Sequence, residues 1–329
     1  MGRRAYRGAV IGAGGIARTA HLPGFQAAAP RIEIVAALDS DPNVGPLDGL
    51  PLFRDRSSLL AAGPLDFVDV CTPPSSHLPL ALWALENGLH VLCEKPVAVT
   101  RADAETLTTA ARKAGRVVIP CHQYRFNPVW QQIGEWVRQG AIGHWHLAEL
   151  SVYRLRADGG AVPWRSLRAD SSGGILLDHG THLLYSLFDL GGEPKTVQAW
   201  TGRLRHREYE VEDTAQLLIG FADRLATVLL TWAAGHRENR VRIIGERGTI
   251  DWHGGTLSLE REGEPRQELD YTAQLDKRSY AGWFAGLFGA FADAMDHGEA
   301  DEALADITRV AAVLEAAYES ARSGCTVSV

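Results

Sequence analysis

The apolar residues of the chain follow one pattern in the first third of the sequence and a different one further on. In the first third, short apolar runs alternate with segments whose apolar residues recur at helical spacing, such as 80–86 and 101–114. We interpret the runs as buried strands and the segments between them as helices. Strands that alternate with helices predict an α/β fold with a doubly wound parallel sheet. The predicted strands are 8–11, 33–38, 66–71, 89–93 and 117–121.

From Thr214 onward, apolar and polar residues alternate, which is typical of antiparallel strands. One face of the first such strand carries Ala215, Leu217, Ile219 and Phe221. We interpret a further apolar set as a second face that a partner surface covers in an oligomer; its members are Val228, Leu230 and Trp232. The strands that follow, predicted as a meander with Gly-containing turns, are 225–232, 239–245, 249–252 and 256–260.

The segment 283–295 carries aromatic and apolar residues at helical spacing, so we expect a helix packed on a sheet. The alternative interpretation makes this helix a wall of the substrate pocket. With 329 residues, two domains are expected, each large enough to bury a core.

Composition narrows the class of protein. The net charge of −7 argues against a nucleic-acid or anionic-membrane partner, and no apolar stretch reaches the ~18 residues of a membrane span. The four cysteines lie far apart without a CxxC pair, and the histidines show no metal-binding spacing, so no metal site is predicted. The apolar run after Arg3, Arg4 and Arg7 is too short for a signal peptide. We therefore expect a cytoplasmic protein with reduced cysteines.

A glycine-rich turn joins the first predicted strand to a helix-like segment. Gly12 allows a tight turn, Gly14 lets backbone N–H groups approach a pyrophosphate, and Ala17 keeps the helix close to the sheet. Gly15 and Ile16 complete this G-x-G-x-x-A turn. Its position between a strand and a helix predicts a dinucleotide site.

Asp39 ends the second predicted strand, where an acid can accept hydrogen bonds from the adenosine ribose. No arginine follows closely in the sequence to bind a 2′-phosphate, which favours NAD over NADP. The alternative is that Asp39 only caps a turn.

Glu94, Lys95 and Pro96 follow directly on the apolar run that ends at Cys93. Open parallel sheets bind ligands beyond the carboxyl ends of their strands, and the proline restricts the backbone of Lys95. We expect Lys95 to be the point where cofactor and substrate meet.

A second set of candidate residues lies on a helix expected to start after Ser172, its predicted N-cap. Asp178 and His182 are four residues apart and share one helix face, so the carboxylate could orient the imidazole for acid–base chemistry. The alternative is a helix whose polar residues pair with backbone or solvent. The charged segment 206–213 is expected to be a solvated loop.

Several motifs together resemble the glucose–fructose oxidoreductase and inositol dehydrogenase family, often written Gfo/Idh/MocA. The resemblance covers nearly the whole chain in order. The motifs are Gly12-Ala13-Gly14-Gly15-Ile16-Ala17, Thr72-Pro73-Pro74-Ser75-Ser76-His77, Glu94-Lys95-Pro96, Tyr124-Arg125-Phe126-Asn127-Pro128, Gly140-Ala141-Ile142-Gly143, Trp164-Arg165, Gly173-Gly174-Ile175-Leu176-Leu177-Asp178-His179-Gly180-Thr181-His182 and Tyr318-Glu319-Ser320-Ala321-Arg322-Ser323-Gly324.

The resemblance implies a Rossmann domain, 1–122, followed by an α/β domain, 123–329, on a large open, mostly antiparallel sheet. A C-terminal helix that packs back on the first domain is one option. Homodimers or homotetramers through the C-terminal sheet are implied, together with NAD(P)-dependent chemistry on a sugar, cyclitol or related polyol.

The resemblance also implies the roles of individual residues. Lys95, Asp178 and His182 fall on catalytic positions. The residues it implies for cofactor binding, beyond the glycine turn and Asp39, are Thr72, Pro73, His77, Glu94, Lys95, Gln123, Trp164 and Arg165. Tyr153, His179 and Tyr185 are candidates for substrate contact.

Two positions depart from the family pattern. Gln123 stands where many members have Asn, and Tyr185 stands where many carry an acid three residues after the motif histidine. The second departure predicts an altered substrate pocket.

The expected reaction is hydride transfer between nicotinamide and a carbinol carbon. Either His182 or Lys95 could take the hydroxyl proton, and the sequence leaves this choice open. A second hypothesis is an NAD-dependent glycosidase or lyase that transiently oxidises a C3 hydroxyl and recycles the cofactor. A third is a non-catalytic sensor that kept the cofactor fold.

Overall fold

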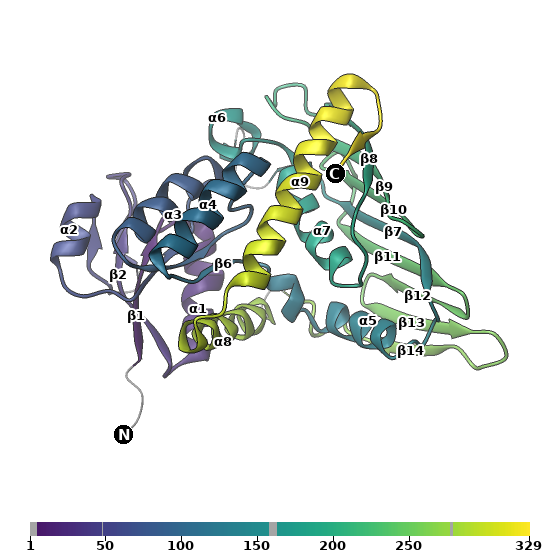
Figure 1. Ribbon diagram of the computed structural model, residues 1–329, viewed down its shortest axis with the longest axis horizontal. Helices are drawn as coiled ribbons and strands as arrows, with labels where there is room; N and C mark the ends of the chain where they lie inside the picture. Colours follow the sequence, from purple (N-terminus) through teal and green to yellow (C-terminus); the bar gives the residue numbers. More distant parts are fainter. Residues whose placement is uncertain (1–4, 48, 158–162, 277–278) are drawn as a thin grey trace. The chain divides into compact units, whose positions relative to one another are not determined.

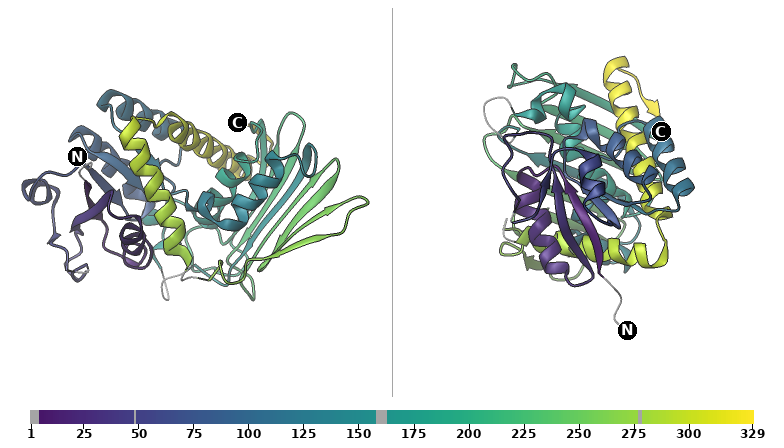
Figure 2. Two further views of the ribbon diagram at one scale, coloured as in Figure 1. Left: turned by 90° about the horizontal axis from the view of Figure 1, so that it is seen from below. Right: turned by 90° about the vertical axis from the view of Figure 1, so that its left-hand side faces the viewer.

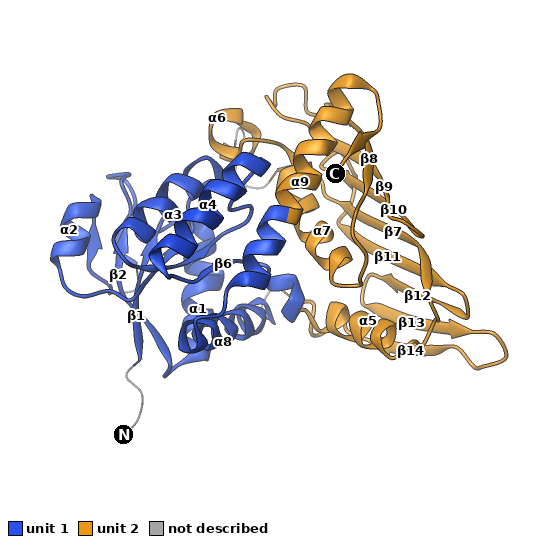
Figure 3. Cartoon of the chain, viewed as in Figure 1, with its two compact units in different colours: residues 1–126, 277–308 blue, residues 127–276, 309–329 orange. Residues whose placement is uncertain are grey.

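The computed structural model describes residues 5–47, 49–157, 163–276 and 279–329, and the chain forms two compact units (Figure 3). Unit 1 comprises Met1–Phe126 and Lys277–Thr308, and unit 2 comprises Asn127–Asp276 and Arg309–Val329. The expected domains, 1–122 and 123–329, differ from these units chiefly in residues 277–308, which belong to unit 1.

Unit 1 contains a six-stranded sheet in the order β3-β2-β1-β4-β5-β6, and every neighbouring pair is parallel (Figure 1). This is the Rossmann order, so the predicted doubly wound sheet is confirmed. The strands are β1 (Tyr6–Ile11), β2 (Ile32–Leu38), β3 (Leu52–Phe53), β4 (Phe67–Val70), β5 (His90–Cys93) and β6 (Val118–Pro120).

Two helices of unit 1, those predicted at 80–86 and 101–114, end where the sequence predicts. The predicted helix 101–114 is α4, which begins with a capping box between Thr100 and Asp103 and ends at Gly115 with a φ of 60°. The elements are η1 (Ala17–His21, a π-helical turn), α1 (Leu22–Ala28), α2 (Arg56–Ala61), η2 (Pro74–Ser76), α3 (His77–Glu86), α4 (Arg101–Ala114), η3 (Gln123–Phe126) and α8 (Tyr280–His297).

Helix α8 returns late in the chain to complete the core of unit 1. Phe288 stacks on Phe25 of α1 with ring centroids 3.9 Å apart, and Phe291 meets Phe67 of β4 edge to face. A Cβ on Gly24 would lie 2.7 Å from Cβ of Phe284, so this position requires glycine for the close approach of α1 and α8. The predicted helix is therefore confirmed, and its aromatic face packs into a core.

Unit 2 is built on a nine-stranded mixed sheet in the order β14-β13-β12-β11-β7-β10-β9-β8-β15, in which only the pair β7 and β10 is parallel among the described residues. The predicted mostly antiparallel sheet is confirmed. The strands are β7 (Trp145–Tyr153), β8 (Thr196–Gly202), β9 (Thr214–Gly220), β10 (Leu225–Thr231), β11 (Glu238–Gly245), β12 (Gly248–His253), β13 (Thr256–Arg261), β14 (Gln267–Asp270) and β15 (Val327–Ser328).

The helical elements of unit 2 lie on one face of this sheet, and the described residues place no helix on the other face (Figure 2). They are α5 (Pro128–Arg138), η4 (Trp164–Ser166), α6 (Arg168–Ser171), η5 (Leu176–Gly180, a second π-helical turn), α7 (Thr181–Phe188) and the later part of α9 (Asp301–Ser323), a helix that begins in unit 1.

Two sequence-based expectations about this sheet were wrong. The strands do not form a simple meander, because β7 pairs with both β10 and β11 and lies between them. The supposed second apolar face is not separate, because Leu230 pairs with Ala215 and Val228 with Leu217. Cross-strand partners lie on the same face, so both apolar sets point into the buried side that the helices cover.

The described residues include no helix with the length and apolar character that a membrane crossing requires.

Candidate active site

The glycine turn after β1 has the geometry that a bound pyrophosphate requires. Gly12 has a φ of +94°, and a Cβ there would lie 2.9 Å from the backbone N of Thr72, so only glycine fits. A Cβ on Gly14 or Gly15 would meet no atom within 4 Å. The turn therefore presents open space in front of its backbone, and the residues present fit a dinucleotide phosphate.

Asp39 at the end of β2 is held against this turn. Its Oδ2 accepts a hydrogen bond of 2.8 Å from the backbone N of Ala13, and its Oδ1 accepts one of 2.9 Å from the backbone N of Asp41. The fold also brings Arg54 to this end of the sheet. Because Arg54 is fifteen residues from Asp39 in the sequence, it was not predicted to lie here. Its guanidinium donates to the carbonyl oxygens of Asp39 at 3.1 Å and Asp41 at 2.6 Å.

The buried side chain of His77 connects the loops that follow β4 and β5. The Nδ1 atom of His77 lies 2.8 Å from the carbonyl oxygen of Pro96, and its Nε2 lies 2.7 Å from that of Thr72. Burial lowers the pKa of His77, although both hydrogen bonds act in the other direction. Both ring nitrogens of His77 contact carbonyl oxygens of the chain itself. We therefore interpret the role of His77 in cofactor binding as indirect: it connects these two loops. Pro73 lies in the first of them.

Glu94 follows β5 and is buried, whereas Lys95 beside it is partly exposed. The Glu94 Oε2 accepts a hydrogen bond of 3.2 Å from the backbone N of Lys95, and its Oε1 lies 3.0 Å from Nε2 of His21. His21 is not among the candidate residues predicted from the sequence. The available signal was a histidine four residues from both Ala17 and Phe25, on the apolar face of the helical segment after the glycine turn.

Gln123, where many family members have Asn, begins η3 just beyond β6. Its Oε1 is buried and has no hydrogen-bond partner among the described residues. A buried oxygen of this kind could accept a hydrogen bond from a bound group, such as the carboxamide of nicotinamide.

In unit 2, a buried carboxylate caps the helix that carries the second set of candidates. The Glu212 Oε1 accepts hydrogen bonds from the backbone N atoms of Gly174 at 2.9 Å and Leu176 at 3.3 Å, and from the Tyr318 hydroxyl at 2.8 Å. Burial raises the pKa of Glu212, and burial beside this carboxylate raises that of Tyr318. Tyr318 belongs to the last family motif, which thus supports the start of the site helix.

The structure corrects two predictions about this region. Ser172 is not the N-cap, because it adopts a φ of 62° and the helix start at Ile175 has no capping side chain of its own. The segment 206–213 is a loop that is solvated only in part: Arg207, Glu208 and Glu210 are exposed, whereas Tyr209, Glu212 and Asp213 are buried. Charged residues usually indicate exposure, but the buried carboxylates of Glu212 and Asp213 accept hydrogen bonds from backbone N–H groups.

Asp178 lies in the π-helical turn η5 beside two cationic or potentially cationic groups. Its Oδ2 is 3.5 Å from Nε of Arg165 and 3.3 Å from Nδ1 of His179. The Arg165 guanidinium also stacks over the Trp164 ring at 4.3 Å. The structure therefore joins Asp178 to two residues for which the sequence suggested other roles.

His182 is paired with the residue that departs from the family pattern. Its Nδ1 lies 2.9 Å from the hydroxyl oxygen of Tyr185, and the two rings meet edge to face. Tyr185 has no exposed surface and His182 is 7% exposed. Tyr185 can therefore influence a substrate only through its neighbours.

Tyr153 lies apart from this group. It pairs with Thr231 and Glu238 in the sheet, next to Val152, whose side chain points into the buried face. Neighbouring residues of a strand point to opposite faces, so Tyr153 lies on the face away from α7.

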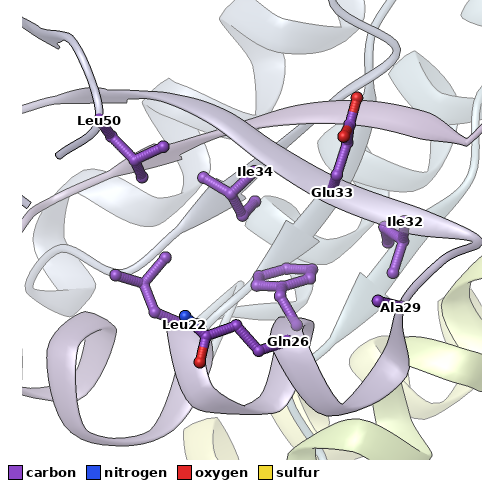
Figure 4. A pocket seen from close by; sticks show the side chains of 8 residues that line it. Leu22, Gln26, Ala29, Ile32, Glu33, Ile34 and Leu50 are labelled. Carbon is purple, nitrogen blue, oxygen red and sulfur yellow. The ribbon is translucent and has the colours of Figure 1, made fainter. Parts of the chain in front are cut away.

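A separate pocket lies between α1 and β2 (Figure 4). None of its residues belongs to the candidate site. It is lined by Leu22, Phe25, Gln26, Ala29, Ile32, Glu33, Ile34 and Leu50.

The candidate residues thus form two groups, each described within its own unit. The glycine turn, Asp39, Thr72, His77, Glu94, Lys95 and Gln123 belong to unit 1, and Trp164, Arg165, Asp178, His179, His182 and Tyr185 belong to unit 2. A Rossmann unit with an open glycine turn, joined to a helix-covered sheet that carries acid–base residues, defines a dinucleotide-dependent oxidoreductase.

Comparison with known proteins identifies the family. Residues 6–122 match the oxidoreductase family model with an NAD-binding Rossmann fold, and residues 130–251 match the GFO/IDH/MocA C-terminal domain. The chain belongs to this family of NAD-dependent oxidoreductases, which act on CH–OH groups. The resemblance seen in the sequence is confirmed, and so are NAD as cofactor and the assignment as an enzyme.

Individual relatives act on sugars by name. The chain is 28% identical to D-apiose dehydrogenase of Paraburkholderia graminis over 98% of this chain and 90% of the relative. It is 32% identical to D-glucoside 3-dehydrogenase of Escherichia coli over 59% of this chain and 56% of that relative. A solved oxidoreductase from Agrobacterium radiobacter, in complex with NAD+, L-tartaric acid and magnesium, is 25% identical with a TM-score of 0.87 over 98% of both chains.

Proposed function

We propose that this protein oxidises a secondary hydroxyl group of a sugar or related polyol and uses NAD as the hydride acceptor. The observation that carries the proposal is the polar cluster of Asp178 and His179 with Arg165. The first two lie in η5, directly before the helix α7 that carries His182, and Arg165 lies in η4. Hydroxyl-rich substrates need several fixed donors and acceptors for their orientation. The names of the relatives, D-apiose dehydrogenase and D-glucoside 3-dehydrogenase, support a sugar.

The unit 1 residues would hold the cofactor. The backbone of Gly12 to Ile16 would bind the pyrophosphate, Asp39 the adenosine ribose, and Gln123 the nicotinamide end. When bound, nicotinamide supplies the acceptor for the hydride. The Thr72–His77 loop would close the site beside the glycine turn, because Thr72 already lies against Gly12.

The chain's own residues would handle the proton. Removing a hydride from an alcohol also requires removing the hydroxyl proton, so a base must lie within hydrogen-bond reach of that oxygen. We assign Lys95 to the substrate oxygen, where it would take the hydroxyl proton or stabilise the developing alkoxide charge. His182 is the other candidate for this proton, and Asp178 with Arg165 and His179 would orient the neighbouring hydroxyls. Lys95 belongs to unit 1 and His182 to unit 2.

The test is a screen of aldoses, methyl glycosides and cyclitols with NAD and NADP, in which NADH absorbance and the oxidised product are measured together. Equal amounts of NADH and keto product support the proposal. Product without accumulated NADH would instead support the glycosidase or lyase hypothesis. Lys95→Ala should lower kcat by about 10³-fold while NAD still binds.

We also propose that a second copy of the chain covers the bare face of the nine-stranded sheet and gives a homodimer or homotetramer. That face carries exposed apolar residues on adjacent strands: Leu147 at 39%, Trp200 at 49%, Leu218 at 37% and Leu225 at 36%. Light scattering of the wild type and of Trp200→Lys with Leu218→Lys tests this, because charges on the face should yield monomers. A cytoplasmic location stays a prediction.

A further inference from the structure

Three ionisable side chains from separate elements meet in the interior of unit 1. His21 in η1 and Asp69 in β4 have no exposed surface, and Glu94 after β5 is 8% exposed. The His21 ring bridges the two acids, with Nδ1 2.8 Å from Oδ2 of Asp69 and Nε2 3.0 Å from Oε1 of Glu94. We call these residues the His21 bridge.

The geometry fixes where the protons are. A carboxylate only accepts hydrogen bonds, so an imidazole with a carboxylate at each nitrogen makes both bonds only when both nitrogens carry hydrogen. Burial alone would lower the pKa of His21, but Asp69 and Glu94 reverse this and raise the pKa to about 10. Burial would likewise raise the pKa of Glu94, but the hydrogen bond and charge of His21 lower it. The bridge is thus an imidazolium between two carboxylates.

The same location has the residue types of a metal site. Ligand atoms of His21, Asp69 and Cys121 lie within 4.8 Å of one another. However, both His21 nitrogens already contact carboxylates, and burial raises the pKa of the Cys121 and Cys71 thiols well above the usual value. A proton on His21 therefore accounts for the cluster without a metal ion.

The His21 bridge is continuous with Lys95. The Glu94 Oε1 binds His21, while its Oε2 accepts the backbone N–H of Lys95 at 3.2 Å. On the other side, His77 contacts the carbonyl oxygen of Pro96. The backbone of Lys95 is thus held from both sides by buried histidines, and of the two it is His21 that lies between carboxylates.

We propose that protonated His21 is a positioning residue, which orients Glu94 and through it the backbone of Lys95 for catalysis. The titratable groups that face it are Asp69 of β4, Cys71 directly after β4, Glu94 beyond β5 and Cys121 beyond β6. From α8 it meets only aromatic rings, Phe284 at 4.6 Å and Phe288 at 5.5 Å between centroids. These rings exclude water from the bridge and tolerate a cation.

The catalytic part of this inference rests on the proposed function, whereas the structural part does not. The first experiment therefore measures the wild type without substrate. Ring nitrogens of 15N-labelled histidine at pH 8, with His21 assigned by comparison with His21→Gln, should show both nitrogens protonated. A neutral His21 ring at pH 8 would overturn the proposal. So would a stoichiometric metal ion that is lost in His21→Gln.

The second experiment tests the link to Lys95 without turnover. Hydrogen exchange of the Lys95 amide should become at least about tenfold faster in His21→Gln, because the Glu94 acceptor is released. His297→Gln, which replaces an exposed histidine at the end of α8, is the matched control and should leave this exchange unchanged. Unchanged exchange in His21→Gln would contradict the link.

The third experiment measures catalysis once a substrate is known. In His21→Gln, kcat should fall about 10²-fold, with KM and the Kd for NAD within about threefold, because misplacement of a catalytic group acts on the chemical step. Adding Asp69→Asn restores the charge balance and should regain at least about tenfold in kcat. A purely structural role would lower the melting temperature and NAD affinity together, without such recovery, and that result would refute the proposal. A wild type without activity on any polyol would refute the proposed function, while the first two experiments still decide the His21 bridge.

Discussion

The hydroxyl oxygen of Tyr185 lies 2.9 Å from Nδ1 of His182, and both rings are buried. A phenol is the better donor and a neutral imidazole nitrogen the better acceptor, so the Tyr185 proton points at Nδ1 in this interpretation. The hydrogen of His182 then sits on Nε2, so that atom cannot accept the hydroxyl proton. If His182 carries its hydrogen on Nε2, Lys95 is left as the candidate for the base, a choice that the sequence left open.

Tyr185→Phe tests this assignment. The change removes the hydroxyl and frees Nδ1, so either tautomer of His182 becomes accessible and kcat/KM should fall about tenfold. Nitrogen NMR of the His182 ring should show hydrogen on Nε2 in the wild type and a mixture in the variant. Tyr153→Phe, on the opposite face of the sheet, is the control. Hydrogen on Nδ1 in the wild type would return the role of base to His182.

Stability should depend on pH through the His21 bridge. The folded-state pKa of about 10 lies above the usual 6.5, so the stabilisation is fully present below pH 6.5 and is lost as pH rises towards about 10. One proton contributes a slope of at most about 1.4 kcal/mol per pH unit. Urea denaturation from pH 6 to 10 should show a decline for the wild type that His21→Gln lacks. Parallel curves for the two proteins would contradict the raised pKa.

Asp39→Ala should change the preference between the two cofactors. The carboxylate can bind a ribose hydroxyl and repels a 2′-phosphate, so its removal should raise the Kd for NAD about tenfold and lower the discrimination against NADP by at least as much. Fluorescence titration with NADH and NADPH measures both effects. Asp41→Ala, an exposed acid in the same loop, should alter neither by more than about threefold.

Tyr318→Phe should destabilise unit 2. The hydroxyl donates to the buried Glu212 carboxylate, and hydrogen bonds to charged groups contribute about 1.5–3 kcal/mol to the free energy of unfolding. Urea denaturation should show a loss of this size, together with faster hydrogen exchange in α7. A loss no greater than that of Tyr153→Phe would mean that Glu212 caps the helix without help from Tyr318.

The parts of the fold that could be predicted from the sequence are those determined by residues close together in the chain. The parallel sheet, the glycine turn and the ends of α4 follow from apolar periodicity, glycine conformation and capping residues. The position of β7 between β10 and β11 could not be predicted, because it joins strands more than seventy residues apart and no local pattern records such a pairing. The same reason explains the exchanged faces of Val228 and Leu230.

The site shows the same division. Gly12, Asp39 and Lys95 were found because their types and positions relative to strand ends carry the signal. His21, Asp69 and Glu212 were missed, because each acts through a partner distant in sequence: 48 residues separate His21 from Asp69, and 106 separate Glu212 from Tyr318. In a sequence, a buried charged residue is visible only as a polar residue among apolar ones. Its partner can be identified only from the folded structure.

The late return of α8 determines when unit 1 can fold during synthesis. All six strands of its sheet have left the ribosome long before Phe284, Phe288 and Phe291 are made. At about 5–20 residues per second, roughly 10–30 seconds pass in which Phe25 and Phe67 have no cover. Nascent chains in this interval are expected to be substrates for chaperones, and products that terminate before α8 should aggregate.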